Sequence, residues 1–151
     1  PVCLSDADTL RRVCFPTRPP DTIYRLIARA ERLARQDYGL GVVAMLNGEL
    51  VGYGQLTVWP RCAEISDLAV AESWQGRGIG SAILSHLLYV ARRMSATCVE
   101  IGAAVDNLRA LALYRRLGFH DDHRVEVTLD GAAVAVQYLR LILEPQQPPP
   151  R

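Results

Sequence analysis

The sequence contains no lysine, few aromatic residues and no long apolar run. All 17 positive charges are arginines, and the formal net charge is +1. The absence of lysine excludes a P-loop, whose phosphate-binding loop must end in Gly-Lys-Ser/Thr. A net charge this close to zero creates no field that recruits nucleic acid or an anionic membrane, and no segment resembles a signal peptide or a membrane span. We therefore expect a soluble, cytoplasmic protein without a nucleic-acid or membrane partner.

Cysteine is also scarce. Cys3, Cys14, Cys62 and Cys98 show neither metal-ligand spacing nor a short disulfide framework, which favours a reducing compartment. We expect Cys98 to lie in a core strand as a small apolar residue. The segment 120–123 (HDDH) resembles a metal site, but consecutive side chains point in different directions and cannot easily converge on one ion. We predict a solvated turn there and no metal.

The length indicates one domain. A chain of 151 residues can bury a full core without a second domain, and we assign this domain to residues 1–144. Residues 145–151 (PQQPPPR) lack the apolar residues needed to pack, so they are expected to form a disordered or polyproline tail. The last strand carries Leu139, Leu141 and Leu143, and we consider it a candidate edge for a homodimer.

The centre of the chain, residues 64–119, reads as strand, glycine loop, long helix, strand and short helix. Glu64–Val70 (EISDLAV) is apolar and β-branched enough for a half-buried strand. The glycine loop then opens a helix that runs from Ile79 to about Met94, with apolar residues at helical spacing. Cys98–Ala103 is the next strand. Such a βαβ unit makes its two strands parallel, with a right-handed crossover.

Caps, breakers and turn residues predict the other elements. In chain order these are a short edge strand at Val2–Leu4, a helix capped by Ser5 or Asp6, a helix from Asp21 or Thr22 to about Gln36, strands at Val42–Leu46 and Leu50–Val58, and strands at Arg124–Leu129 and Ala132–Leu143. Asn47-Gly48 and Asp130-Gly131 join the two strand pairs, because these residue types favour the positive φ of a tight hairpin turn.

Two features of the central stretch indicate a ligand. A glycine-rich loop between a strand and a helix presents unpaired backbone N–H groups at the positive end of the helix dipole, which suits phosphate or pyrophosphate. It is not a dinucleotide fingerprint, because Ser81 stands where a third glycine is needed and no acidic residue ends a strand about twenty residues later. Further on, Asn107, Ala110 and Tyr114 share one face of the helix that Gly118 terminates.

Gln75-x-x-Gly78-x-Gly80 after a strand, followed by Asn107, Ala110, Tyr114 and Gly118-Phe119, resembles the GNAT superfamily of acetyl-coenzyme A-dependent N-acetyltransferases. The resemblance covers residues 64–119 strongly and the rest loosely. It implies a single α/β (mixed α+β) domain, in which a mixed, mostly antiparallel sheet with splayed parallel central strands is flanked by helices. It also implies direct transfer of the acetyl group of acetyl-coenzyme A to a primary amine in a ternary complex.

The resemblance further implies where the co-substrate binds. The pantetheine arm would lie along the first parallel strand like an added strand, with the thioester carbonyl near the N–H of Leu68. Loop N–H groups would hold the pyrophosphate, with Arg77 beside it. The expected cofactor-binding residues are Leu68, Ala69, Val70, Gln75, Gly76, Arg77, Gly78, Ile79, Gly80, Ser81, Asn107, Ala110 and Tyr114.

Two side chains are candidates for proton transfer. Tyr114 could protonate the leaving thiolate, although it could also be a core aromatic residue. Glu64 could accept the proton of the amine through water; alternatively it is an ordinary strand carboxylate that pairs with Arg61. Asp67 should point to the other sheet face unless a bulge intervenes.

The acceptor is not identified by any motif. The resemblance places it against residues 15–21, and it could be a small molecule or a protein N-terminus. Two other functions stay open: an acyl-coenzyme A-binding regulatory module without catalysis, and a nucleotide-binding module that uses the same glycines.

Overall fold

A computed structural model describes residues 1–129 and 131–144 of the chain. Its elements are η1 (Leu4–Asp6), α1 (Ala7–Cys14), α2 (Pro20–Arg35), β1 (Gly39–Leu46), β2 (Glu49–Val58), β3 (Ala63–Val70), η2 (Glu72–Trp74), α3 (Ile79–Arg93), β4 (Cys98–Ala104), α4 (Leu108–Arg116), β5 (His120–Leu129) and β6 (Ala132–Ile142). One sheet holds the strands in the order β1-β2-β3-β4-β6-β5. Only β3 and β4 pair in parallel. The predicted mixed, mostly antiparallel α/β fold is confirmed.

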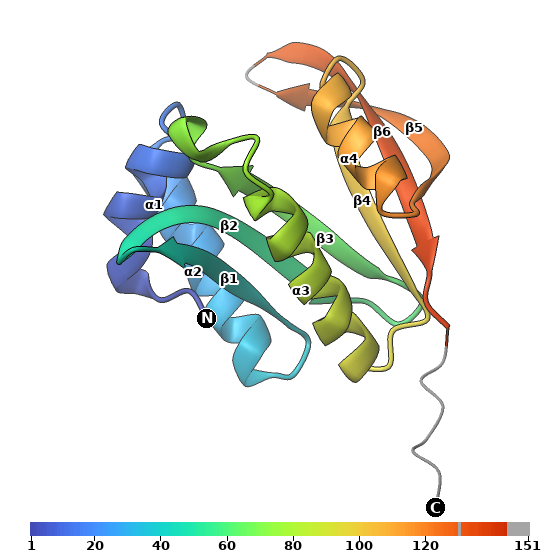
Figure 1. Ribbon diagram of the computed structural model, residues 1–151, viewed down its shortest axis with the longest axis horizontal. Coiled ribbons are helices and arrows are strands. Elements are labelled where there is room, and N and C mark those ends of the chain that lie inside the picture. Colours follow the sequence, from blue (N-terminus) through green and yellow to red (C-terminus); the bar gives the residue numbers. More distant parts are fainter. Residues whose placement is uncertain (130, 145–151) are drawn as a thin grey trace, which may run out of the picture.

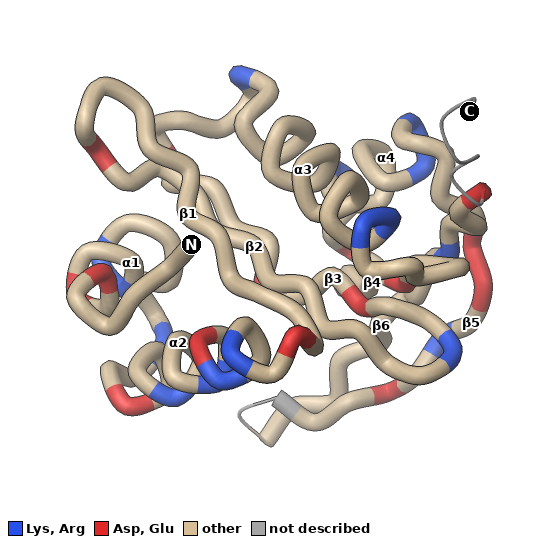
Figure 2. Tube along the Cα trace, turned by 90° about the horizontal axis from the view of Figure 1, so that it is seen from below, with Lys and Arg blue, Asp and Glu red and all other residues tan. Residues whose placement is uncertain are grey.

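Helices cover the two faces of the sheet. Figure 2 shows α1 and α2 on one face and α3 and α4 on the other. The first pair packs on β1 and β2 through a buried cluster that includes Leu10, Ile27 and Tyr53. α3 packs on β2 and β3 through a larger cluster around Leu84 and Leu87. Among the described residues, no helix covers β4 and β6 on the α1/α2 face, so that part of the face stays open (Figure 2).

The two parallel strands separate after a short contact. β3 and β4 are paired only at Ala63↔Val99, Glu64↔Glu100 and Ile65↔Ile101, and Figure 1 shows them diverging beyond that point. On its other side β3 bulges, because Asp67 and Leu68 together oppose the single residue Gly54 of β2. Asp67 adopts a positive φ of 54°, which is uncommon for a residue with a side chain. The predicted splay is confirmed.

The structure places a disulfide at the closed end of this splay. Cys62 immediately precedes β3, Cys98 begins β4, and the two are bonded to each other with their Cα atoms 4.9 Å apart. Cys3 and Cys14 are free. The spacing of the cysteines shows no short disulfide framework, and this long-range pair was not anticipated from the sequence. The parallel register of β3 and β4 brings together two cysteines that are 36 residues apart in the chain.

Near the N-terminus, two predictions are wrong. Val2–Leu4 is no edge strand: Val2 donates one backbone hydrogen bond to Gly41, and Leu4 already belongs to η1. The second helix begins at Pro20 rather than after Asp21 or Thr22, because proline suits the first helical position, where its missing N–H has no partner to lose. Asp6 does occupy the N-cap position of α1, but its side chain makes no cap hydrogen bond and accepts one from the Cys3 N–H instead.

Two further predictions are wrong near the C-terminus. Residues 120–123 form the start of β5 rather than a turn; β5 is the edge of the sheet, so polar side chains are tolerated there. β6 pairs with β4 on one side and β5 on the other, which removes it as a free dimer edge. The hairpin at Asn47-Gly48 is confirmed by positive φ at both residues. Asp130 and the predicted tail, 145–151, lie outside the described residues. The described helices include none long and apolar enough to cross a membrane.

Candidate functional site

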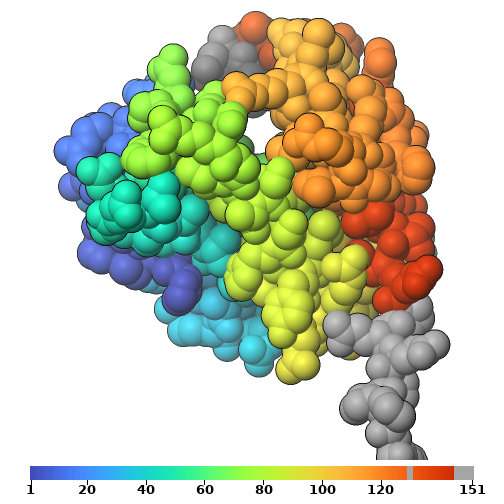
Figure 3. Space-filling model, viewed as in Figure 1, coloured from blue at the N-terminus to red at the C-terminus, as the bar shows by residue number. Residues whose placement is uncertain are grey.

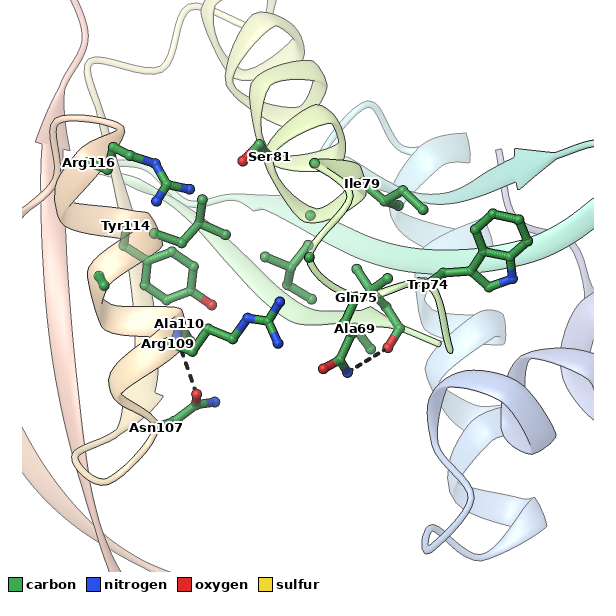
Figure 4. Close-up of a pocket in the computed structure, with 17 residues that line it drawn as sticks. Ala69, Trp74, Gln75, Ile79, Ser81, Asn107, Arg109, Ala110, Tyr114 and Arg116 are labelled. Atoms are coloured by element: carbon green, nitrogen blue, oxygen red, sulfur yellow. Dashed lines mark hydrogen bonds between the residues drawn. The ribbon is translucent and has the colours of Figure 1, made fainter. Parts of the chain in front are cut away.

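A cleft of about 520 Å³ opens where β3 and β4 separate. Its walls are the end of β3, the glycine loop with the first turn of α3, and one face of α4 (Figure 4). In Figure 3 it is visible as an opening between the green loop segment and the orange helix. Every predicted cofactor-binding residue except Arg77 lines it: Leu68, Ala69, Val70, Gln75, Gly76, Gly78, Ile79, Gly80, Ser81, Asn107, Ala110 and Tyr114.

The strand wall offers backbone groups to a ligand. The Ala69 carbonyl oxygen points toward β2, 3.2 Å from where a Cβ of Gly52 would stand, and the Ala71 N–H donates to Val51 of β2. Because backbone groups alternate in direction along a strand, those of Leu68 and Val70 face the gap left by β4. The Gln75 side chain donates to the Val70 carbonyl oxygen at 3.1 Å. The N–H groups of Leu68 and Val70 are therefore aimed at the cleft.

The loop wall has the features of an anion site. Gly76 and Gly78 adopt φ of 76° and 82°, which glycine reaches without steric cost. Gly78 is the N-cap residue of α3, and no described side chain accepts hydrogen bonds from the first turn of this helix. The first N–H groups of a helix have no partner within the helix. Those of α3 are consequently available to a ligand, together with the positive end of the helix dipole.

The α4 wall is fixed by a cap that was not predicted. Asn107 precedes the helix, and its side-chain oxygen accepts a hydrogen bond from the Ala110 N–H at 3.2 Å. Its NH₂ group is left to face the cleft. Tyr114 is only 5% exposed, and its hydroxyl points into the cleft in Figure 4. Burial raises the pKa of Tyr114 to about 12, so the phenol is fully protonated at neutral pH.

The predicted base lies on the other side of the sheet. Ala63 and Ile65 belong to the core beneath α3, so strand alternation directs Glu64 to the open face. Its carboxylate accepts a hydrogen bond from Trp59 at 3.3 Å, and the described residues include no cation in ion-pair contact with it. Burial raises the pKa of Tyr138, and the charges of Glu64 and Glu100 raise it further, so these three groups are neighbours.

Asp67 is much closer to the cleft than Glu64. It directly precedes Leu68 and forms a 2.8 Å ion pair with Arg18, whose guanidinium lies 4.3 Å from the centre of the Phe15 ring. Phe15 packs edge-on against Tyr53, with ring centres 6.1 Å apart. This contact ties the α1–α2 loop to the bulge of β3. From the sequence, the direction of the Asp67 side chain depended on whether a bulge intervenes in the strand. No sequence pattern indicated that Arg18 would pair with Asp67.

The arginines are arranged differently from expectation. Arg77 stacks on Trp74, with its guanidinium carbon 4.8 Å from the ring centre, and is absent from the cleft lining as the structure describes it. The cations that do line the cleft are Arg109 and Arg116 of α4. Both belong to a larger group of arginines that lie near the predicted site in the sequence, and no pattern distinguished these two from the others.

The cleft matches the shape and chemistry of coenzyme A. An extended arm fits beside the free N–H groups of Leu68 and Val70, and a pyrophosphate fits the glycine loop at the start of α3. The volume falls within the range of typical ligand pockets, about 300–1,000 Å³. The residues present therefore suit this co-substrate.

The fold and the cleft define a mixed α/β protein with a glycine loop beside a gap between two splayed strands. The model of the acetyltransferase (GNAT) family matches residues 4–119. The chain belongs to this family.

Relatives with more specific names match only part of the chain. N-alpha-acetyltransferase RimI of Mycobacterium tuberculosis is 39% identical over 82 residues, which are 52% of this chain and 50% of that protein. Mycothiol acetyltransferase of Clavibacter michiganensis is 37% identical over 94 residues, 62% of this chain and 28% of the relative. The chain thus spans half or less of the length of these two relatives.

The fold also resembles solved structures along nearly its whole length. YncA of Salmonella typhimurium, a putative acetyltransferase solved with acetyl-coenzyme A, superposes with a TM-score of 0.77 at 20% identity, covering 99% of this chain and 95% of that one. At this identity the likeness concerns the fold alone.

Proposed function

We propose that the protein is an acetyl-coenzyme A-dependent N-acetyltransferase that delivers the acetyl group directly to a primary amine in a ternary complex. The observation that carries this proposal is the junction of three walls: the free N–H groups of Leu68 and Val70, the uncapped start of α3 and the Tyr114 hydroxyl all face one cleft. Family membership and the acetyl-coenzyme A-bound YncA structure support the choice of co-substrate.

Acetyl-coenzyme A supplies an activated acyl carbon on a thioester. The Leu68 N–H would donate to its carbonyl oxygen, and this hydrogen bond strengthens as negative charge develops there. The NH₂ group of Asn107 would donate to amide oxygens of the arm, and Ala110 leaves space beside it. The chain's own contribution is thus orientation of the thioester and stabilisation of charge on its oxygen.

The raised pKa of Tyr114 refines its role. A thiolate has a pKa of about 8.5, so full proton transfer from a phenol with a pKa of about 12 is uphill by roughly 5 kcal/mol. Tyr114 therefore acts by donating a hydrogen bond to the leaving sulfur, which stabilises its charge without surrendering the proton. The proton that the sulfur finally binds comes from solvent or from the attacking amine.

The amine approaches from the face opposite α3 and α4. Glu64 lies four residues before Leu68, which corresponds to roughly 13 Å along a strand, so it can receive the amine's proton only through water. Asp67, next to Leu68, would lie near the acceptor, with its charge already balanced by Arg18. The names of these two relatives suggest a mycothiol-type compound and α-amino groups as acceptors to test.

The test combines binding with turnover. Isothermal titration with acetyl-coenzyme A comes first, followed by thiol release with amino acids, polyamines, amino sugars and peptides with a free N-terminus. We expect micromolar binding and release with one amine class. Tyr114→Phe should lower kcat by about tenfold, the worth of one hydrogen bond to a charged atom, and leave the binding constant unchanged. Exposed Cys3 requires a protein-only blank in this assay.

A matched pair of variants tests the base. Glu64→Gln should lower kcat/KM for an amine that is protonated at the assay pH, whereas Glu100→Gln, its neighbour on the same open face, should not. Equal effects of both variants would contradict a specific role for Glu64. Binding without turnover for any amine would favour a regulatory acyl-coenzyme A-binding module, and absence of binding would remove the proposal.

A further inference from the structure

Two arginines of α4 line the cleft, and one of them reaches across it. In Figure 4, Arg109 extends from α4 toward the segment that carries Ala69 and Gln75. Its Nη2 atom lies 2.9 Å from the position that a Cβ of Gly76 would occupy. The guanidinium therefore rests directly on the backbone of the glycine loop, at the place where the loop's N–H groups are available to an anion.

We propose that Arg109 is the side chain that binds the pyrophosphate of coenzyme A, and that Arg77, the arginine within the loop itself, does not. This inference rests on the proposed function, because it concerns how the same cleft holds its co-substrate. The residue proposed to bind the phosphates, Arg109, belongs to α4 and therefore comes from the other side of the cleft from the glycine loop.

The charge of Arg109 is not satisfied by the protein. Within the described part of the chain, no carboxylate lies within 4.0 Å of its guanidinium, whereas Arg18, Arg115 and Arg140 each have an acidic partner. A guanidinium can donate two parallel hydrogen bonds to phosphate oxygens. An unpaired guanidinium placed over a glycine loop therefore complements a dianionic pyrophosphate.

Arg77 is oriented for a different contact. Its guanidinium carbon lies 4.8 Å from the ring centre of Trp74, a residue that precedes the loop. Burying its planar face against an indole is favourable in itself, so turning Arg77 toward the cleft would forfeit that contact. Arg109 makes no comparable contact with the described aromatic residues and already lies in the cleft. The two arginines thus differ in position while carrying the same charge and similar exposure, which makes them a matched pair for experiment.

The geometry of α4 explains why position 109 is suited to this task. Arg109, Leu113 and Arg116 all line the cleft at the i, i+4 and i+7 spacing of one helix face. Asn107, the N-cap of α4, fixes the start of that face only two residues earlier. A side chain at Gly76 would displace the Arg109 guanidinium from the loop, because its Cβ would lie 2.9 Å from Nη2.

The experiment compares Arg109→Ala with Arg77→Ala by isothermal titration. The probes are coenzyme A and dephospho-coenzyme A, which keeps the pyrophosphate but lacks the 3′-phosphate. We expect Arg109→Ala to weaken both ligands by about tenfold or more, the range for a hydrogen bond to a charged group. Arg77→Ala should change either affinity by less than about twofold, as for an exposed charge with no ligand contact. Arg109→Lys, which keeps the charge, should recover part of the loss.

Three results would overturn the proposal. Arg109→Ala could leave both affinities unchanged, Arg77→Ala could weaken binding as much as Arg109→Ala, or Arg109→Ala could weaken coenzyme A alone, which would move Arg109 to the 3′-phosphate. Thermal unfolding of each variant separates lost binding from lost structure. If the wild-type protein binds neither ligand, the proposed function fails. If the wild-type protein binds and the Arg109→Ala variant binds equally well, only the role of Arg109 fails.

Discussion

Reduction of the Cys62–Cys98 disulfide should destabilise the fold by a measurable amount. The bond closes a loop of 36 residues, and the chain-entropy relation gives about 4 kcal/mol for a loop of this length. With a urea slope near 2 kcal/mol/M, the unfolding midpoint should fall by about 2 M. The measurement is urea unfolding, followed by circular dichroism, with and without a thiol reductant.

Thiol counting provides an independent check of the same bond. Two of the four cysteines are free, so the unreduced protein should titrate as two thiols in denaturant and as four after reduction. In the native state Cys3, which is exposed, should react quickly, whereas burial raises the pKa of Cys14 to about 11 and should make it slow.

The control for the unfolding experiment is the double variant Cys62→Ser/Cys98→Ser. Its midpoint should not respond to reductant, because Cys3 and Cys14 form no bond that reductant could break. Four titratable thiols in the unreduced, denatured wild-type protein would refute the reasoning. So would a wild-type midpoint that reductant leaves in place.

Two further predictions concern the core around the cleft. Burial favours the neutral phenol of Tyr114, so the stability from its raised pKa of about 12 is fully present below pH 10 and is lost between pH 10 and pH 12, about 3 kcal/mol in all. Urea titrations across this range should show a smaller alkaline loss for Tyr114→Phe than for the wild type, and equal losses would contradict the burial of this hydroxyl. Gly54→Ala places a Cβ 2.7 Å from Ile83 and 3.0 Å from Leu87 of α3, and this overpacking should cost about 1–3 kcal/mol. An unchanged unfolding midpoint would show that α3 can shift without cost.

The central unit was predictable because its signals are local and mutually consistent. The apolar run of β3, the glycines before α3 and the helical spacing of its buried residues all favour one arrangement, and the structure agrees within a residue or two. The residues expected to bind the cofactor came from the resemblance to the acetyltransferase family, and the contacts proposed for them are mainly backbone groups. Backbone chemistry depends on the positions of strands and glycines, which the sequence displays directly.

The features that escaped prediction depend on tertiary placement. Cys62 and Cys98 meet only because two strands run parallel in one particular register. The polar start of β5 reads as a turn, because an edge strand needs no apolar alternation. Arg77 and Arg109 are indistinguishable as sequence letters, and only the position of Trp74 and the direction of α4 separate them. Side-chain roles are therefore less predictable here than backbone roles.

The short contact between β3 and β4 has a mechanical consequence. In the described sheet, β3 and β4 are paired at three residue pairs, and a disulfide joins Cys62, just before β3, to Cys98 of β4. The two halves of the sheet are therefore connected at one end and separate at the other. A ligand lying between the halves would bridge them at the open end, where the strands no longer touch. Hydrogen exchange at Leu68 and Val70 should then slow when the ligand is bound, because the ligand acts as a missing piece of the sheet as well as a reactant.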